Sequence, residues 1–186
     1  MNERRLFFAI PLSSQTRTRL ARETSTWESL PLFVTRPDHL HVTLLFLGFV
    51  PDKDVERYSE AAREICSETE PFEILFDGIV YAPEGESPKM LWLRGVESEP
   101  LLRLRNAFEA ELSERPAEFQ RFRPHVNLAR LQRNRFALLP EDRRVALPKS
   151  LRIVEPVSSV VLFESVGAGA KREYLAMEEF PLGEGI

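Results

Sequence analysis

The sequence predicts an α+β fold built on antiparallel sheets. Apolar strand patterns and amphipathic helix patterns follow one another along the 186 residues without the regular strand–helix–strand alternation of parallel sheets. A coarse order of strand, helix and motif strand occurs in each half, which indicates an old duplication. The chain has only 8 glycines and no low-complexity linker. We therefore expect two tightly packed lobes instead of two free domains.

The first half begins with clear local signals. Residues 5–12 form an apolar run that predicts a buried strand. Ser13 and Ser14 offer an N-cap, and a helix is expected to follow them to about Trp27. Residues 39–47 predict a second strand, which ends at Gly48. A helix is expected after Pro51, with one apolar face made of Val55, Tyr58, Ala62 and Ile65.

The second half continues with mixed elements. The stretch 132–148 is polar and contains two prolines, so we predict a loop over the functional site. The other expected elements are strands at 72–82 and 89–94, a helix at 99–112, a strand at 122–131 and strands at 152–164 and 173–180.

The composition is that of a water-soluble protein, with 43% hydrophobic and 29% charged residues. No apolar run approaches the roughly 20 residues needed to cross a bilayer. The run after Arg5 contains Pro11 and lacks a small-residue cleavage site, so we interpret it as a strand and not as a signal peptide. Cys66 is the only cysteine, which excludes an intrachain disulfide and favours a reducing cytoplasm. We expect it to be buried and inert.

Charge is unevenly distributed. The net charge of −4 argues against a general nucleic-acid coat. Residues 121–135 contain five arginines and no acidic residue: Arg121, Arg123, Arg130, Arg133 and Arg135. This local positive charge suits a phosphate-bearing ligand. The alternative is an ordinary Arg-rich strand and loop balanced by nearby glutamates.

Two of the three histidines head nearly identical segments, His41-Val-Thr-Leu and His125-Val-Asn-Leu. An unperturbed imidazole has a pKa of about 6.5, so it can give or take a proton near neutral pH. A pair of imidazoles can supply an acid and a base to one reaction. We therefore expect each half of the chain to contribute one imidazole to a shared site.

Alternation along a strand gives each motif a chemical face. His41 and Thr43 point the same way, as do His125 and Asn127. Two imidazoles that flank a phosphate can hydrolyse a cyclic phosphodiester without a metal, because one protonates the leaving oxygen and the other takes a proton from water. Thr43 and Asn127 are candidate donors to the phosphate oxygens. The alternative, that each histidine is a half-exposed strand residue without a role, is disfavoured by the repeat.

Residues near the motifs offer further candidates. Arg130 is a candidate phosphate or RNA ligand, but alternation turns it away from His125 unless a bulge or a strand end intervenes. Phe46 has the equivalent place after His41, and we expect it to pack in the core, with base stacking as the alternative. Trp27 and Trp92 are also expected in the core. His39 forms an H-x-H pair that is able to bind zinc, but no cysteine and few acids complete such a site.

The chain resembles the two-histidine (2H) phosphoesterase superfamily, which is defined by two H-x-[ST]-h motifs where h is hydrophobic. More closely it is similar to the RNA 2′,3′-cyclic phosphodiesterases, also called the 2′-5′ RNA ligase family. The likeness covers most of the chain and is carried by residues 5–12 (RLFFAIPL), 36–48 (RPDHLHVTLLFLG), 91–93 (LWL), 122–130 (FRPHVNLAR) and 174–182.

The resemblance implies that residues 1–186 form a single bilobal 2H phosphoesterase domain. Two antiparallel or mixed sheets would carry helices on the outside, with pseudo-twofold symmetry and the active cleft between the lobes. It also implies hydrolysis of 2′,3′-cyclic phosphate ends to 2′-phosphates, with no metal and no cofactor. His41 would be the general acid on O3′ and His125 the general base. The family normally has Thr or Ser where this chain has Asn127, whose amide still offers a donor.

Other functions remain open at this point. The reverse reaction would make the chain a 2′-5′ RNA ligase, and a small cyclic nucleotide or a 2′-5′ oligonucleotide would be an alternative substrate. Asn127 favours a further class, a module that binds RNA ends or phosphate without turnover. In each case the expected partner is an RNA with a 2′,3′-cyclic phosphate end or a small cyclic nucleotide. A monomer is expected because one chain supplies both imidazoles.

Overall fold

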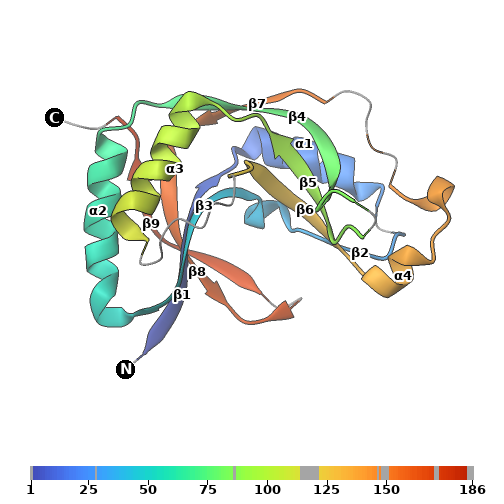
Figure 1. Cartoon of the computed structure of the whole chain (residues 1–186), viewed down its shortest axis with the longest axis horizontal. Coiled ribbons are helices and arrows are strands. Elements are labelled where there is room, and N and C mark those ends of the chain that lie inside the picture. The colour runs from blue at the N-terminus through green and yellow to red at the C-terminus, as the bar shows by residue number, and fades with distance from the viewer. Residues whose placement is uncertain are drawn as a thin grey trace.

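The computed structural model describes residues 2–27, 29–85, 87–113, 122–145, 147, 151–169 and 172–183. No helix in these ranges is both long and apolar enough to cross a membrane. The elements, in chain order, are β1 (Glu3–Pro11), α1 (Ser14–Ser25), β2 (Leu32–Val34), η1 (Pro37–His39), β3 (His41–Pro51), η2 (Asp52–Asp54), α2 (Val55–Ser67), β4 (Phe72–Ala82), β5 (Met90–Gly95), α3 (Glu99–Leu112), β6 (His125–Leu131), α4 (Arg133–Ala137), η3 (Glu141–Arg143), β7 (Ile153–Val157), β8 (Ser159–Val166) and β9 (Glu173–Pro181) (Figure 1).

The strands form one antiparallel path with two halves. Their order is β7-β4-β5-β6-β3-β1-β8-β9, and the short strand β2 adds to β6. The first four strands form one half and the last four the other. The halves join where β3 meets β6, at the pair Val42 and Val126. The α+β prediction is confirmed, and the two expected sheets are continuous at this one junction.

The helices cover different halves. Helices α2 and α3 pack together and lie against the half that contains β3, β8 and β9 (Figure 1). Helix α1 is tied to the other half through β7, because the backbone N–H and the hydroxyl of Ser13 both donate to the buried carboxylate of Glu155. Arg19 also donates to the carbonyl of Arg152 at 3.0 Å. The Ser13 hydroxyl in turn caps α1 by accepting from the N–H of Thr16.

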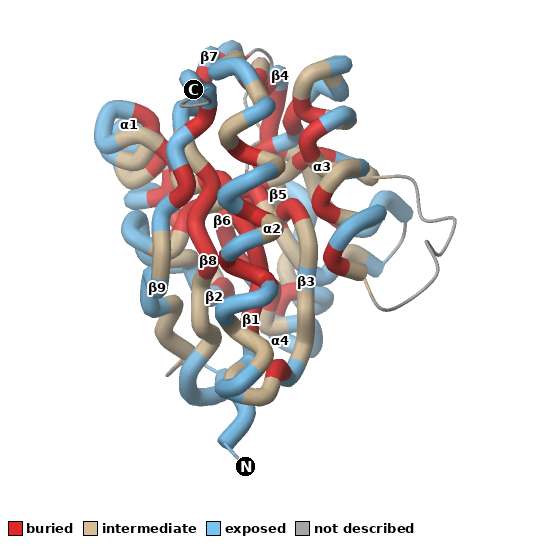
Figure 2. Tube along the Cα trace, turned by 90° about the vertical axis from the view of Figure 1, so that its left-hand side faces the viewer, coloured by how far each residue is buried: buried red, intermediate tan, exposed pale blue. Residues whose placement is uncertain are grey.

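Strand β1 lies at the centre of the core, where buried residues concentrate (Figure 2). Leu6, Phe8 and Ile10 alternate onto its core face, and the Phe8 ring meets Phe108 of α3 at 4.8 Å and Phe180 of β9 at 6.0 Å between centroids. Its opposite face is also covered, so the strand is buried on both sides.

Several expected elements differ from the structure. The single strand predicted at 152–164 is wrong, because Ser158 separates β7, which pairs with β4, from β8, which pairs with β1 and β9. The stretch 132–148 is not simply a loop, because it contains the one-turn helices α4 and η3. Strand β2 was not predicted. Arg121, residue 146 and residues 148–150 lie outside the described residues.

Candidate active site

The two histidine motifs lie on neighbouring strands. Because β3 and β6 are antiparallel and Val42 pairs with Val126, the register sets His41 opposite Asn127 and Thr43 opposite His125. All four side chains lie on the face opposite the two buried valines. His41 and His125 are thus diagonal neighbours, a relation that corresponds to roughly 7–8 Å between strand positions. The structure therefore brings the four predicted residues together at the junction of the two halves.

Each imidazole is held by the same hydrogen bond. His41 Nδ1 donates to the carbonyl of His39 at 2.7 Å, and His125 Nδ1 donates to the carbonyl of Arg123 at 2.7 Å. A carbonyl only accepts, so the bond fixes the proton on Nδ1 and leaves Nε2 for the reaction. Both accepting carbonyls lie two residues before the histidine. The repeated geometry supports the duplication that the sequence indicates.

Burial controls the protonation of both rings. Together with the nearby His39 and His125 imidazoles, and against the opposing effect of the hydrogen bond to the His39 carbonyl, it lowers the pKa of His41 from 6.5 to about 4. Burial also lowers the pKa of His125. Both rings are therefore neutral at pH 7 until a ligand brings negative charge.

Aromatic side chains surround His41. The Phe7 ring lies 5.1 Å from the imidazole between centroids, Phe163 lies at 6.0 Å, and Tyr174 meets it edge-on at 5.3 Å. Tyr174 also contacts His39, whose Nε2 lies 3.2 Å from the Glu173 carboxylate. His39 therefore borders the site on η1. Sequence reasoning did not assign Tyr174 to the site.

Trp92 is the ring that packs against His125. The two rings are stacked, with 3.8 Å between centroids and 22° between planes. Trp92 was predicted to be a core residue, and this is wrong because it lies on the face opposite the buried Leu91 and Leu93. The alternation of leucine and tryptophan in residues 91–93 is the sequence feature that could have placed Trp92 on the site face. Trp27, in contrast, is buried as expected.

Both motifs end in a β-bulge at the same position. Phe8 pairs with Leu45 and Ala9 with Thr43, so Leu44 is an extra residue in β3. The equivalent extra residue in β6 is Leu128, because Leu91 pairs with Ala129 and Trp92 with Asn127. An extra residue shifts the alternation of every side chain that follows it.

The bulges change where two candidate residues point. Arg130 pairs with Met90, two residues from Trp92, so it shares the face of His125 and is exposed. Phe46 follows the first bulge and is 69% exposed, so the prediction of core packing is wrong. It contacts Phe7, with 5.8 Å between ring centroids.

The two candidate phosphate donors occupy the other diagonal of the same four strand positions. Thr43 and Asn127 are both half-buried on the shared face. The Oδ1 atom of Asn127 is buried without a hydrogen-bond partner among the described residues. The amide oxygen thus has acceptor capacity that the described part of the fold does not use. Cys66 lies elsewhere and is buried as expected, and burial raises the pKa of its thiol to about 12.

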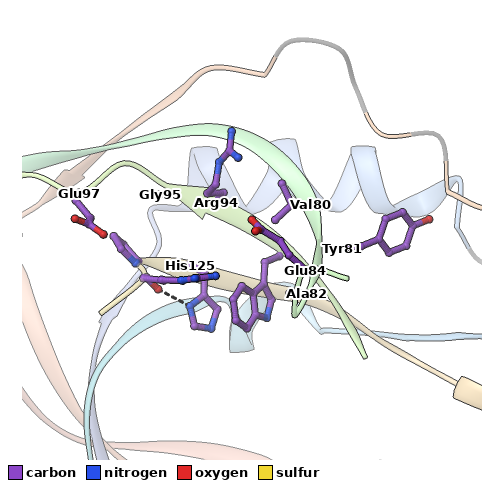
Figure 3. A pocket seen from close by; sticks show the side chains of 11 residues that line it. Val80, Tyr81, Ala82, Glu84, Arg94, Gly95, Glu97 and His125 are labelled. Atoms are coloured by element: carbon purple, nitrogen blue, oxygen red, sulfur yellow. Dashed lines mark hydrogen bonds between the residues drawn. The ribbon is translucent and has the colours of Figure 1, made fainter. Parts of the chain in front are cut away.

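A pocket opens beside His125, over β4 and β5 (Figure 3). Its lining includes Val80, Trp92, Arg94, Arg123 and Pro124. Arg94 is the cross-strand neighbour of His125 and is ion-paired with Asp77 at 2.8 Å. His41 is not among the residues that line this pocket.

Known proteins show the same sequence pattern and the same fold. The family model described as the 2′-5′ RNA ligase superfamily matches residues 17–164. A protein of Methanothermobacter thermautotrophicus named RNA 2′,3′-cyclic phosphodiesterase is 30% identical over 188 residues, which cover 96% of this chain and 98% of that protein. A protein of the same name from Geobacillus stearothermophilus is 28% identical over 98% of this chain, but the match spans only 58% of its length.

Solved structures have the same fold as this chain. A crystal structure of a Thermus thermophilus protein matches with a TM-score of 0.80 and 28% identity, covering 97% of this chain and 98% of that one. Escherichia coli LigT in its apo form matches in fold, with a TM-score of 0.76 at 23% identity, covering 98% of this chain and 99% of that one. On the match to its family model, which covers both histidine motifs, this chain belongs to the 2′-5′ RNA ligase superfamily.

Proposed function

We propose that this chain is a metal-independent RNA 2′,3′-cyclic phosphodiesterase that hydrolyses cyclic phosphate ends to 2′-phosphomonoesters. The observation that carries the proposal is the convergence of two identically held imidazoles, His41 and His125, across the junction of β3 and β6. The names of the relatives from Methanothermobacter thermautotrophicus and Geobacillus stearothermophilus support the same activity.

In the proposed reaction, the Nε2–H of His41 protonates the leaving O3′ of the ribose. The neutral Nε2 of His125 takes a proton from the water that attacks phosphorus. The bonds from Nδ1 to backbone carbonyls keep each Nε2 directed at the reaction. Burial makes His41 hard to protonate, so the negative charge of the bound phosphate is needed to favour its imidazolium form.

Thr43 and Asn127 are proposed to donate to the non-bridging phosphate oxygens and to stabilise the charge that develops on them. Arg130 is proposed to bind phosphate or the RNA strand, which its position after the Leu128 bulge supports. Its exposed guanidinium forms no ion pair within the described part of the chain.

The chain is further proposed to act as a monomeric, single-domain cytoplasmic enzyme. Both imidazoles come from one chain, and the two halves share one sheet path, which supports a single bilobal domain. The lone buried Cys66 is compatible with a reducing compartment. Light scattering after gel filtration tests the monomer.

The test of the reaction is turnover of 2′,3′-cyclic AMP by the purified protein in EDTA. We expect 2′-AMP as the product, and His41→Ala and His125→Ala should each lower kcat by about 10²–10⁴-fold. His39→Gln is the matched control and should stay within a few-fold of the native rate. A strict requirement for a divalent metal would contradict the mechanism. Formation of 3′-AMP would contradict O3′ as the leaving group.

A further inference from the structure

The backbone segments that lead into the two histidines are anchored differently. In the second motif, the carbonyl of Pro124, directly before the histidine, accepts from the N–H of Gly95 on β5 at 2.9 Å. The equivalent carbonyl of the first motif belongs to Leu40 and accepts from the N–H of Leu12 at 3.4 Å, which is longer than the usual range for such a bond. The backbone before the first histidine is therefore tied less firmly to its neighbour.

Side chains at the start of β9 give this segment a second anchor. The Nε2–H of His39 donates to the carboxylate of Glu173 at 3.2 Å, and the His39 side chain is only 9% exposed. The other oxygen of the same carboxylate accepts from Arg36 at 2.6 Å. The Tyr174 ring packs against His39 and also meets His41 edge-on. The segment before His41 is thus held by the far end of the chain.

We propose that Glu173 is a positioning residue for the general acid and acts through His39. The inference rests on the proposed function, which gives His41 the role of acid. The His39 carbonyl accepts from Nδ1 of His41 at 2.7 Å, so the place of this carbonyl decides where Nε2 of His41 points. The same bond raises the pKa of His41 against the effect of burial, so it favours the protonated ring that the reaction needs.

The side chain and the carbonyl of His39 move together because they belong to one residue. Without Glu173, the nearly buried Nε2–H of His39 would lose its acceptor, and a buried donor without a partner is costly. Residue 39 would then turn towards water and carry its carbonyl away from His41. A misplacement of about 1 Å can lower a rate roughly 100-fold.

This role does not require a large contribution to folding. The side chains of Arg36 and Glu173 are 56% and 46% exposed, and ion pairs between exposed side chains add little stability. Glu173→Ala is therefore expected to unfold at a denaturant midpoint close to that of the native protein. A loss of activity in this variant then reports on the geometry of His41.

The first test is steady-state kinetics with 2′,3′-cyclic AMP in EDTA. Glu173→Ala should lower kcat by about 10–100-fold and leave KM within threefold, because the proposed phosphate donors are untouched. Glu173→Gln keeps an oxygen that accepts from His39 and should retain most of the native kcat. The matched control is Glu179→Gln, which alters an exposed glutamate of the same strand that accepts from Ser159, and it should leave kcat unchanged.

Variants at the other end of the bond should give the same pattern. His39→Leu removes the donor to Glu173 and should lower kcat as Glu173→Ala does. His39→Gln keeps an N–H that can reach the carboxylate, which agrees with its expected rate within a few-fold of the native one. The two changes therefore separate the hydrogen bond from the bulk of the side chain.

The tautomer of His41 gives a second test that does not depend on turnover. Long-range ¹H–¹⁵N spectra distinguish a neutral imidazole with its proton on Nδ1 from one with its proton on Nε2. At neutral pH both His41 and His125 of the native protein should carry the proton on Nδ1. In Glu173→Ala, the Nε2–H form should appear at His41 and not at His125.

An unchanged kcat or an unchanged His41 tautomer in Glu173→Ala would overturn the inference, and the proposed hydrolase would still stand. So would a Glu173→Gln protein as inactive as Glu173→Ala, or a tautomer change at both rings, because each would indicate a general structural role. A native protein without any cyclic phosphate turnover would overturn the proposed function. The spectra alone would then decide whether Glu173 positions the His41 ring.

Discussion

Val42 of β3 lies opposite Val126 of β6, and this pair joins the two halves of the sheet in the described structure. Both valines are buried, so the neighbouring residues on each strand turn to the other face. The pair thereby sets His41 and His125 as diagonal neighbours across the junction. Two apolar residues without chemistry of their own therefore position the chemistry of the site.

The Asn127 amide is expected to contribute to phosphate binding. Asn127→Ala should lower kcat/KM for 2′,3′-cyclic AMP by about 10²-fold, the usual effect of losing one donor to a developing charge. Thr43→Ala is the matched variant in the other motif and should have a similar effect. Asn127→Thr should remain active with a changed kcat or KM, measured by steady-state kinetics in EDTA. If Asn127→Thr and Asn127→Ala both leave kcat and KM unmoved, Asn127 is not a phosphate ligand.

The activity of the free protein should favour acid conditions. One ring must be neutral and the other protonated, and burial lowers the pKa of both, to about 4 for His41. The singly protonated form becomes rarer as pH rises above both pKa values. We expect kcat/KM to fall about tenfold per pH unit above pH 6.5.

A bound phosphate shifts the alkaline fall in activity to higher pH. Its negative charge raises the pKa of both rings in the complex, so the alkaline limb of kcat should lie at higher pH than that of kcat/KM. Initial rates from pH 4.5 to 9 separate the two profiles. A kcat/KM that stays flat between pH 6.5 and 8.5 would be incompatible with two buried imidazoles as acid and base.

Arg130 is expected to act on RNA through its charge. Arg130→Ala should weaken binding of an RNA oligomer with a 2′-phosphate end and should reduce the slope of log K against log salt by about 0.7, the value for one phosphate contact on a single strand. Fluorescence anisotropy across a salt series measures the slope. Arg57→Ala, exposed on the outer helix α2, is the control and should leave the slope unchanged. Equal slopes for Arg130→Ala and the native protein would show that Arg130 does not contact an RNA phosphate.

The Glu155 carboxylate is expected to hold α1 on its half of the sheet. It is fully buried and accepts from both the N–H and the hydroxyl of Ser13. Glu155→Gln should lower the free energy of unfolding by about 1.5–3 kcal/mol, because a neutral amide replaces the carboxylate that accepts from both groups of Ser13. Ser13→Ala should cost about 1 kcal/mol, as a lost cap does. Denaturant unfolding measures both, and an unchanged midpoint for Glu155→Gln would show that the carboxylate does not stabilise α1.

Local patterns in the sequence were enough to predict the strands of both motifs. Alternation placed His41 with Thr43 and His125 with Asn127, and the structure has these pairs on one face. The bulges were beyond such reasoning. Leu44 stands in a continuous hydrophobic run, so nothing marks it as the extra residue, and Phe46 was consequently assigned to the wrong face.

The pairing of strands that lie far apart in the chain could not be predicted from the sequence either. Val157 and Val160 belong to a single β-prone stretch, yet the chain crosses at Ser158 from β7 at one edge of the sheet to β8 in the other half. Local propensity does not specify a strand partner. Strand β2 has three residues and α4 has five, which is too short for a periodic pattern.

The central claim is that His41 and His125 bind one phosphate between them. A crystal structure with 2′-AMP, the proposed product, tests it most directly. The account predicts phosphate oxygens about 2.6–3.2 Å from Nε2 of both rings, with the 2′-phosphate at the junction of β3 and β6. A phosphate held by only one ring, or bound away from this junction, would contradict it.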